Sequence, residues 1–505
     1  MRRDLAALAL IVLLHCALFE SGLGGSDGWG YFANVESLVE DHDLDLANNL
    51  SPRGKEGVQG EVGTAEGRLG GMPHPRIPGR VVNSYPLGKA VLDAPFYLLG
   101  KAAGTLWPGL HFPGMRGTPY EGMPPRRMLC ALGMVFESNL LAAGSVVLAF
   151  LALLRLGFPR SVAWSASLLA FVASPLPYYA VNAMSHASAT FVSAAILLFW
   201  AGLPSRGPSR RQAFLLGLLV GAATGLRYAG AGLVPVLGFL LLRGGGGMRR
   251  LLLDRLLPFG LGVLSLAWAE GLRNWIELGR PWQTMYPSLI ESLVWRSPGL
   301  AWTDYLPVVN LFVSGWHGIL WWSPLAGVAL WGLARGGATG ARREAVRMAW
   351  ALSLGQAILP AIGGSFHAGS GFSQRYLCES MPCWALGLAV LLERGCAPLR
   401  KLLVFAALAA WNYALFLLTH AKLARLSVEA GGTREGWILS DYLYVLDQGM
   451  GPGEVLSLVL GSTVPGQLGM PWLALPVVLA ALWAIGWVCW RSRVRKPGPG
   501  PASGP

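Results

Sequence analysis

The sequence predicts an all-α polytopic membrane protein with about twelve transmembrane helices and a long first outer loop that carries interfacial helices. Three observations lead to this fold class. Of the 505 residues, 53% are hydrophobic and only 13% are charged, whereas an ordinary soluble domain carries about twice that charge. Apolar runs of roughly 17 to 22 residues, long enough to cross a bilayer as helix, recur along the whole chain. Basic residues gather in alternate loops between these runs.

Twelve apolar segments are predicted to span the membrane. They lie near 5–23, 128–154, 161–178, 186–203, 212–229, 231–243, 256–274, 316–334, 347–364, 377–393, 402–420 and 471–490. The segments 212–229 and 231–243 are short or interrupted and are expected to pair as a hairpin. Residues 1–23 resemble a signal sequence, but no small-residue cleavage site follows them. We therefore expect a retained first helix.

The loops define the remaining organisation. The expected divisions are 1–23 as first helix, 24–127 as outer loop, 128–420 as multi-span core, 421–470 as outer loop, 471–490 as last helix and 491–505 as cytoplasmic tail. In the first loop we expect a helix from Trp29 to about Asp41. An irregular Gly- and Pro-rich segment, 51–80, should follow, and then an interfacial helix, 91–107.

The net charge of +13 does not indicate a nucleic-acid-binding protein, because the charges follow membrane topology. With the N-terminus inside, more than half of the 40 lysines and arginines fall in short inner loops that contain few acids. This pattern predicts a plasma (inner) membrane protein with both termini in the cytoplasm. The six cysteines show no metal-ligand spacing with histidines, so the sequence supports neither a zinc site nor a disulfide framework.

The glycine-rich stretch 24–32 places a carboxylate, Asp27, where the chain leaves the first apolar segment on the outer side. One interpretation makes Asp27 a general base that takes the proton from an acceptor hydroxyl. The other makes Ser26 or Asp27 the N-cap of the following helix. The two roles are compatible, because a nearby helix N-terminus also favours an ionised carboxylate.

Two arginines are candidates for binding an anion. Arg375 lies where an outer loop enters an apolar segment, and its guanidinium can grip a phosphate in bidentate fashion or extend to the membrane interface. Arg227 lies near the outer end of an otherwise uncharged segment, where ionisable residues face a cavity or a partner. A structural ion pair with Glu270 or Glu137 is its alternative role.

Histidines and aromatic residues surround these positions in the predicted topology. His186 and His317 lie at outer helix ends, where a histidine serves as a hydrogen-bonding group or as a catalyst. The candidate substrate-binding residues are Tyr31, Tyr85, His186, Gln374 and Tyr376. No acidic pair demands a divalent metal, and the sequence predicts neither a metal site nor a cofactor.

Several segments together resemble the GT-C superfamily, and more narrowly its polyprenyl-phosphate-sugar-dependent transferases, which include protein O-mannosyltransferases and lipid A aminoarabinose transferases. The outward Ser26-to-Tyr31 stretch follows a first helix that begins inside. The other segments that carry the resemblance, in order, are 83–88, 184–186, 225–227, 316–324 and 371–376. One position departs from the family pattern, because many relatives carry an Asp-Glu pair where this chain has Asp27 followed by Gly28.

The resemblance implies a GT-C fold and an inverting transfer of a sugar from a polyprenyl-phosphate donor to an acceptor hydroxyl on the outer face of the membrane. Asp27 would be the base, and Arg375, with Arg227 or His317, would hold the donor phosphate. A phosphate leaving group needs charge stabilisation and no strong general acid, so one carboxylate and an arginine suffice. The partners would be the lipid-linked donor, the bilayer and an acceptor that is a glycan, a lipid or a protein.

Two other functions remain open. A transporter or flippase of lipid-linked sugars would use Arg227 and Glu270 as an ion site near the midplane. It would show repeat symmetry and comparable loops on both sides, which this sequence lacks. A catalytically inactive scaffold with the same fold is the third possibility, and the presence of Asp27 argues against it.

Overall fold

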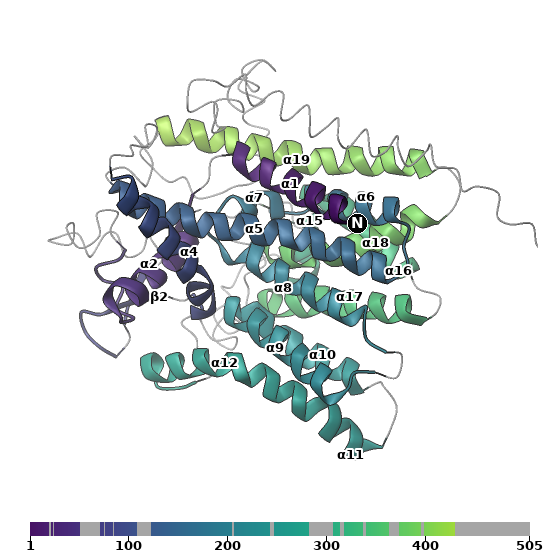
Figure 1. Cartoon of the computed structure of the whole chain (residues 1–505), viewed down its shortest axis with the longest axis horizontal. Coiled ribbons are helices and arrows are strands. Elements are labelled where there is room, and N and C mark those ends of the chain that lie inside the picture. The colour runs from purple at the N-terminus through teal and green to yellow at the C-terminus, as the bar shows by residue number, and fades with distance from the viewer. Residues whose placement is uncertain are drawn as a thin grey trace, which may run out of the picture.

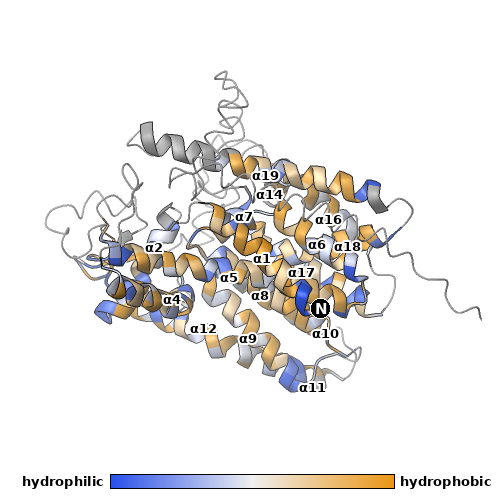
Figure 2. Cartoon of the chain, turned by 45° about the horizontal axis from the view of Figure 1, so that its top comes forward, coloured by the Kyte–Doolittle hydropathy of each residue, from blue (hydrophilic) through white to orange (hydrophobic). Residues whose placement is uncertain are grey.

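The computed structural model describes residues 1–19, 22–23, 25–50, 71–74, 76–83, 85–108, 123–204, 207–242, 247–281, 307–313, 318–336, 340–362, 373–394 and 398–429. These residues are mostly helical, as the sequence predicts. The long helices run roughly alongside one another, and the elements of the first loop gather at one end of them (Figure 1). Hydrophobic residues cover most of the long helices, whereas hydrophilic residues concentrate toward their ends (Figure 2).

The first loop contains both helix and strand. Its elements are α2 (Gly25–Glu36), a π-helical turn (Ser37–Asp41), β1 (Gly71–Pro73), β2 (Val81–Asn83) and α4 (Leu87–Leu106). The strands pair antiparallel, with Gly71 opposite Asn83. The prediction of an all-α fold is therefore wrong in one detail, because the described residues include this short pair of strands. The prediction that segment 51–80 is irregular is also wrong in part, because Gly71–Pro73 forms strand β1. The helix predicted from residue 91 begins earlier, at Leu87, directly after Pro86, whose fixed φ suits a helix start.

The other helices form the main body. In order they are α1 (Arg2–Leu18), α5 (Pro125–Arg155), α6 (Arg160–Ala173), α7 (Leu176–Ala180), α8 (Ser185–Trp200), α9 (Arg210–Leu226), a 3-10 turn (Tyr228–Gly232), α10 (Leu233–Leu242), α11 (Met248–Leu251), a π turn (Leu252–Leu256), α12 (Leu257–Leu278), α14 (Pro307–Val313), α15 (Ile319–Trp322), α16 (Pro324–Arg335), α17 (Gly340–Ile362), a 3-10 turn (Arg375–Ser380), α18 (Met381–Glu393) and α19 (Pro398–Glu429). Helix α19 thus continues past the predicted end at residue 420. The predicted helix at 471–490 lies outside the described residues.

Among the described residues, four helices are long and apolar enough to cross a membrane by length and composition. They are Pro125–Arg155, Leu252–Leu278, Arg375–Glu393 and Arg400–Leu417. Helices Arg160–Ala173, Ser185–Trp200 and Tyr228–Leu242 are apolar but shorter. The chain is therefore an integral membrane protein, whereas the number of spans and the sides of the loops stay predictions.

Glycines set the closest helix contacts. A Cβ on Gly100 of α4 would collide with the carbonyl of Leu129 in α5, and a Cβ on Gly133 would collide with the carbonyl of Phe96. Small residues let two helix backbones approach in this way, and the contact fixes α4 against α5. Helices α9 and α12 approach equally closely at Gly217 and Gly262.

Helix α1 is part of the buried core. Leu8, Val12 and Cys16 on α1 are at most 2% exposed. His15 lies 3.0 Å from the hydroxyl of Tyr413 and 3.1 Å from the carbonyl oxygen of Pro177, so a polar group in an apolar helix has two partners. The chain leaves α1 toward α2, and this path brings Asp27 to the end of the helices where the first loop lies.

Candidate functional site

Asp27 lies in the first turn of α2, because the helix begins at Gly25. Neither Ser26 nor Asp27 is therefore the N-cap, and the interpretation of these residues as a helix cap is wrong. The next residue, Gly28, passes so close to Leu23 that a Cβ would collide with the carbonyl oxygen of Leu23. Glycine at this position is thus required by the backbone path, and a second carboxylate cannot take its place.

Both carboxylate oxygens of Asp27 accept hydrogen bonds from residues far away in the chain. The hydroxyl of Tyr85 donates to Oδ1 at 2.8 Å, and Nη1 of Arg375 donates to Oδ2 at 2.6 Å. Burial opposes ionisation of Asp27, but the guanidinium of Arg375 and the Tyr85 hydroxyl outweigh it and lower its pKa below the ordinary value of 3.8. His186 and Arg227 also lower the pKa of Asp27 through their charge.

Arg375 belongs to a pair of arginines that share one aromatic ring. The guanidinium carbons of Arg375 and Arg227 each lie 5.4 Å from the ring centre of Tyr376. The ring face attracts both cations and keeps them close to one another. Arg375 begins the 3-10 turn before α18, and Arg227 follows the last residue of α9, so two segments distant in sequence supply the pair.

Arg227 is bound by a carboxylate that the sequence did not single out. Its Nη1 donates to Oε1 of Glu379 and lies 2.6 Å from Nδ1 of His186. His186 and Glu379 are themselves 3.3 Å apart. The predicted alternative partners of Arg227, Glu270 and Glu137, are wrong, because they bind Arg273 and Lys89.

The sequence contains an indication that Glu379 has a charged partner. This residue is an acid inside an apolar segment, one helical turn after Arg375, and such residues are rare unless they have a partner. Its side chain is 5% exposed, and that of Arg227 is 12% exposed. The pair therefore places an anion and a cation together in a site shielded from water.

Aromatic side chains line the same region. The hydroxyl of Tyr31 lies 2.9 Å from Oγ of Ser185, and its ring packs on that of Tyr85 with 4.9 Å between centroids. The ring of Tyr179 stacks on His186 at 4.2 Å. The packing of Tyr85 also requires Gly30, because a Cβ there would collide with the Tyr85 ring.

Most of the predicted site residues meet in this region. Gln374 is next to Arg375 in sequence but is fully buried. His317 lies outside the described residues. Within the described ranges, no group of three or more His, Cys, Asp and Glu side chains is arranged to hold a metal ion. What the arrangement offers is an ionised carboxylate next to two arginines.

No known protein family and no curated protein matches the chain by sequence. Among solved structures, it is similar to ArnT from Cupriavidus metallidurans bound to undecaprenyl phosphate, with a TM-score of 0.50 and 16% identity over 96% of this chain and 74% of that one. The apo state of ArnT gives a TM-score of 0.49, with 16% identity over 96% of this chain and 73% of that one. The match to ArnT confirms the predicted GT-C-like fold.

The chain is less similar to the archaeal oligosaccharyltransferase AglB from Archaeoglobus fulgidus in complex with an inhibitory peptide and a dolichol-phosphate. Its TM-score is 0.46, with 13% identity over 90% of this chain and 58% of that one.

Proposed function

We propose that this protein is an integral-membrane inverting glycosyltransferase that moves a sugar from a polyprenyl-phosphate donor to an acceptor hydroxyl on the outer face of the membrane. The observation that carries the proposal is the contact between Asp27 and Arg375, 2.6 Å apart, with Arg227 on the same aromatic ring as Arg375. A base and one anion-binding group suffice for this reaction, and Arg227 is a second anion-binding group. ArnT, which shares the fold, has been solved with undecaprenyl phosphate bound.

The chemistry follows from these groups. The acceptor hydroxyl gives its proton to Asp27 while its oxygen bonds to the anomeric carbon from the face opposite the phosphate. The bond from that carbon to the phosphate oxygen breaks, and its electron pair leaves with the lipid phosphate. Arg375 and Arg227 stabilise the charge on the departing phosphate. Attack from the opposite face inverts the configuration at the anomeric carbon.

Donor binding changes the state of the base in this scheme. Arg375 binds Asp27 in the structure and is one of the two arginines that this scheme assigns to the phosphate. When the phosphate takes over that guanidinium, one of the groups that hold down the pKa of Asp27 is withdrawn. The pKa of Asp27 then rises, and the carboxylate becomes a stronger base at the moment the donor is in place.

The rival function, a transporter with an ion site made by Arg227 and Glu270, has less support. Arg227 binds Glu379, and Glu270 binds Arg273 on its own helix. The two residues thus belong to separate ion pairs. A transporter would also move lipid-linked sugar between leaflets without breaking the sugar–phosphate bond, and this difference separates the two functions by experiment.

The test is release of lipid phosphate from radiolabelled polyprenyl-phosphate hexoses and pentoses by protein in proteoliposomes, supplied with a membrane extract as acceptor. We expect wild type to release it and Asp27→Asn to lose at least 100-fold of the rate, since asparagine keeps the size but not the basicity. Asp254→Asn, which removes an exposed ion pair with Arg210, is the matched control. Full activity of Asp27→Asn would exclude Asp27 as the base, and donor translocation without cleavage would favour the transporter.

A further inference from the structure

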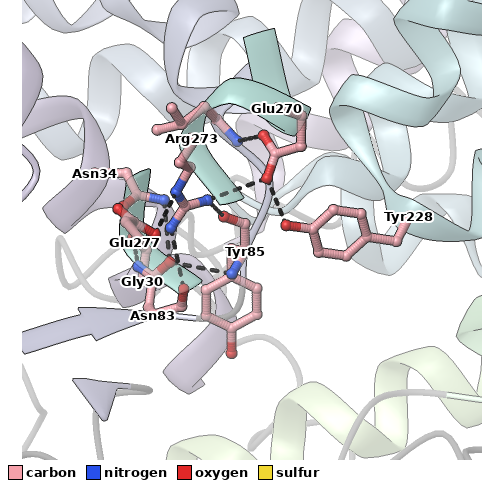
Figure 3. Close-up of polar contacts among 9 residues, drawn as sticks. Gly30, Asn34, Asn83, Tyr85, Tyr228, Glu270, Arg273 and Glu277 are labelled. Atoms are coloured by element: carbon pink, nitrogen blue, oxygen red, sulfur yellow. Dashed lines mark hydrogen bonds and ion pairs between the residues drawn. The ribbon is translucent and has the colours of Figure 1, made fainter. Parts of the chain in front are cut away.

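A second polar cluster is joined to the site through Tyr85. Figure 3 shows it between α12, the segment that joins β2 to α4, and α2. Its centre is Arg273 on α12, which is 4% exposed. Nη1 of Arg273 donates to the backbone oxygen of Tyr85 at 2.5 Å, and Nη2 donates to that of Asn83 at 3.1 Å. Nε donates to Glu277 at 3.0 Å. One guanidinium therefore fixes the backbone on both sides of residue 84.

The segment gripped by Arg273 in turn holds the helix of the proposed base. Nδ2 of Asn83 donates to the backbone oxygen of Gly30 at 2.8 Å, and its Oδ1 accepts from the side chain of Asn34 at 3.2 Å. The same Oδ1 accepts from the backbone nitrogen of Tyr85 at 3.1 Å. Tyr85 then reaches Asp27 with its hydroxyl. Two routes, one through Asn83 and one through Tyr85, thus lead from Arg273 to α2.

Glu270 connects this cluster to the second arginine of the site. Its Oε2 accepts from the backbone nitrogen of Leu87, the first residue of α4, at 2.9 Å. Its Oε1 accepts from the hydroxyl of Tyr228 and from Arg273. Tyr228 is the residue after Arg227. A carboxylate that is 6% exposed therefore joins the side chain of Tyr228, the neighbour of Arg227, to the cluster that holds Asp27.

We propose that Glu270 is a positioning residue that sets the distance between the base, Asp27, and the phosphate-binding Arg227. The inference rests on the proposed function for its meaning, but the contacts that carry it are independent of that function. Glu270 meets three donors with two carboxylate oxygens. An amide at this position has one acceptor oxygen and two N–H donors. In Glu270→Gln the amide NH2 group must therefore face at least one of the three donors that now bind the carboxylate.

The consequence for catalysis is geometric. A reacting group displaced by about 1 Å costs roughly 100-fold in rate. Glu270→Gln should lower kcat roughly 10- to 100-fold, although Glu270 is separated from Asp27 by Arg273 and Tyr85. It should also weaken the hydrogen bond from the Tyr85 hydroxyl to Asp27. The pKa of Asp27 then rises, and the acid limb of the kcat/KM profile moves to higher pH. Tyr85→Phe moves that limb by itself, so the double variant should show no further shift.

The first experiment needs no enzymatic activity. Hydrogen exchange in purified protein is compared for wild type, Glu270→Gln and Glu137→Gln. Glu137 is a fully buried glutamate in another ion cluster, with Lys89, and is the matched control. We expect Glu270→Gln to speed exchange several-fold in peptides that cover residues 27–34 and 83–88, and Glu137→Gln to leave those peptides unchanged. Faster exchange confined to α12, or none, would overturn the inference.

The second experiment measures release of lipid phosphate against pH for Glu270→Gln, Tyr85→Phe and the double variant. A positioning role predicts that the two single shifts of the acid limb are not additive. Additive shifts, or a wild-type acid limb in Glu270→Gln, would contradict it. If wild type cleaves no donor, the proposed function fails, while the exchange measurement still decides whether Glu270 holds the segment around Asp27.

Discussion

Nη1 of Arg375 lies 2.6 Å from Oδ2 of Asp27, although 348 positions of sequence separate the two residues. Their contact joins the turn that precedes α18 to the first turn of α2, and the hydroxyl of Tyr85 completes it at 2.8 Å. The carboxylate is thereby held ionised and oriented by two donors from different parts of the chain. This arrangement makes the pH dependence of the protein predictable.

Tyr85→Phe should move the acid limb of lipid-phosphate release to higher pH. Asp27 acts as a base only when its carboxylate is ionised. Because its pKa is lowered, the carboxylate stays ionised at a pH below 3.8, the ordinary pKa of this group. Loss of the Tyr85 hydrogen bond removes one of the groups that lower this pKa, so the pKa of Asp27 rises. Activity should then start to fall at a higher pH. The check is a profile of kcat/KM that extends below pH 3.8, the ordinary pKa of the group, and coincident acid limbs would contradict the prediction.

Glu379→Gln should destabilise the ligand-free protein and make it more responsive to an anion. The substitution leaves Arg227 buried without its carboxylate, at a cost of roughly 3–5 kcal/mol. Undecaprenyl phosphate can then supply the missing negative charge. Thermal unfolding with and without this lipid should show a larger stabilisation in Glu379→Gln than in wild type.

Glu393→Gln is the control for this measurement, since it removes an exposed ion pair with Arg342 instead. It should respond to undecaprenyl phosphate as wild type does. Equal stabilisation of Glu379→Gln and wild type would show that Arg227 does not bind the lipid phosphate.

Lys89→Met should lower stability strongly and affect the site only through folding. Lys89, Asp93 and Glu137 are all fully buried, and the ammonium lies 2.5 Å and 2.7 Å from the two carboxylates. Without the lysine, two buried carboxylates face each other unpaired, and the loss is roughly 3–5 kcal/mol. Thermal unfolding measures it. Adding Asp93→Asn and Glu137→Gln should recover part of the loss, and a single variant as stable as wild type would disprove the account.

The sequence predicted the helical membrane fold from the length of its apolar segments. It also singled out Asp27 as a candidate base and Arg375 as a candidate phosphate-binding residue, because an isolated charge at the end of an apolar segment is a local signal. It missed Glu379 as the partner of Arg227, which lies 152 positions away. Several acids occur in apolar segments, and only the packing of helices decides which of them meets a given arginine. The role of Arg273 was hidden for the same reason, since its acceptors are backbone oxygens that no residue type reveals.

The close passage of Gly28 over Leu23 has a consequence for how this chain can change over evolutionary time. The oxygen that excludes a side chain at position 28 belongs to the main chain, so no exchange of a neighbouring residue makes room for one. A descendant with an acid pair at this place would first need a longer or rerouted junction between α1 and α2.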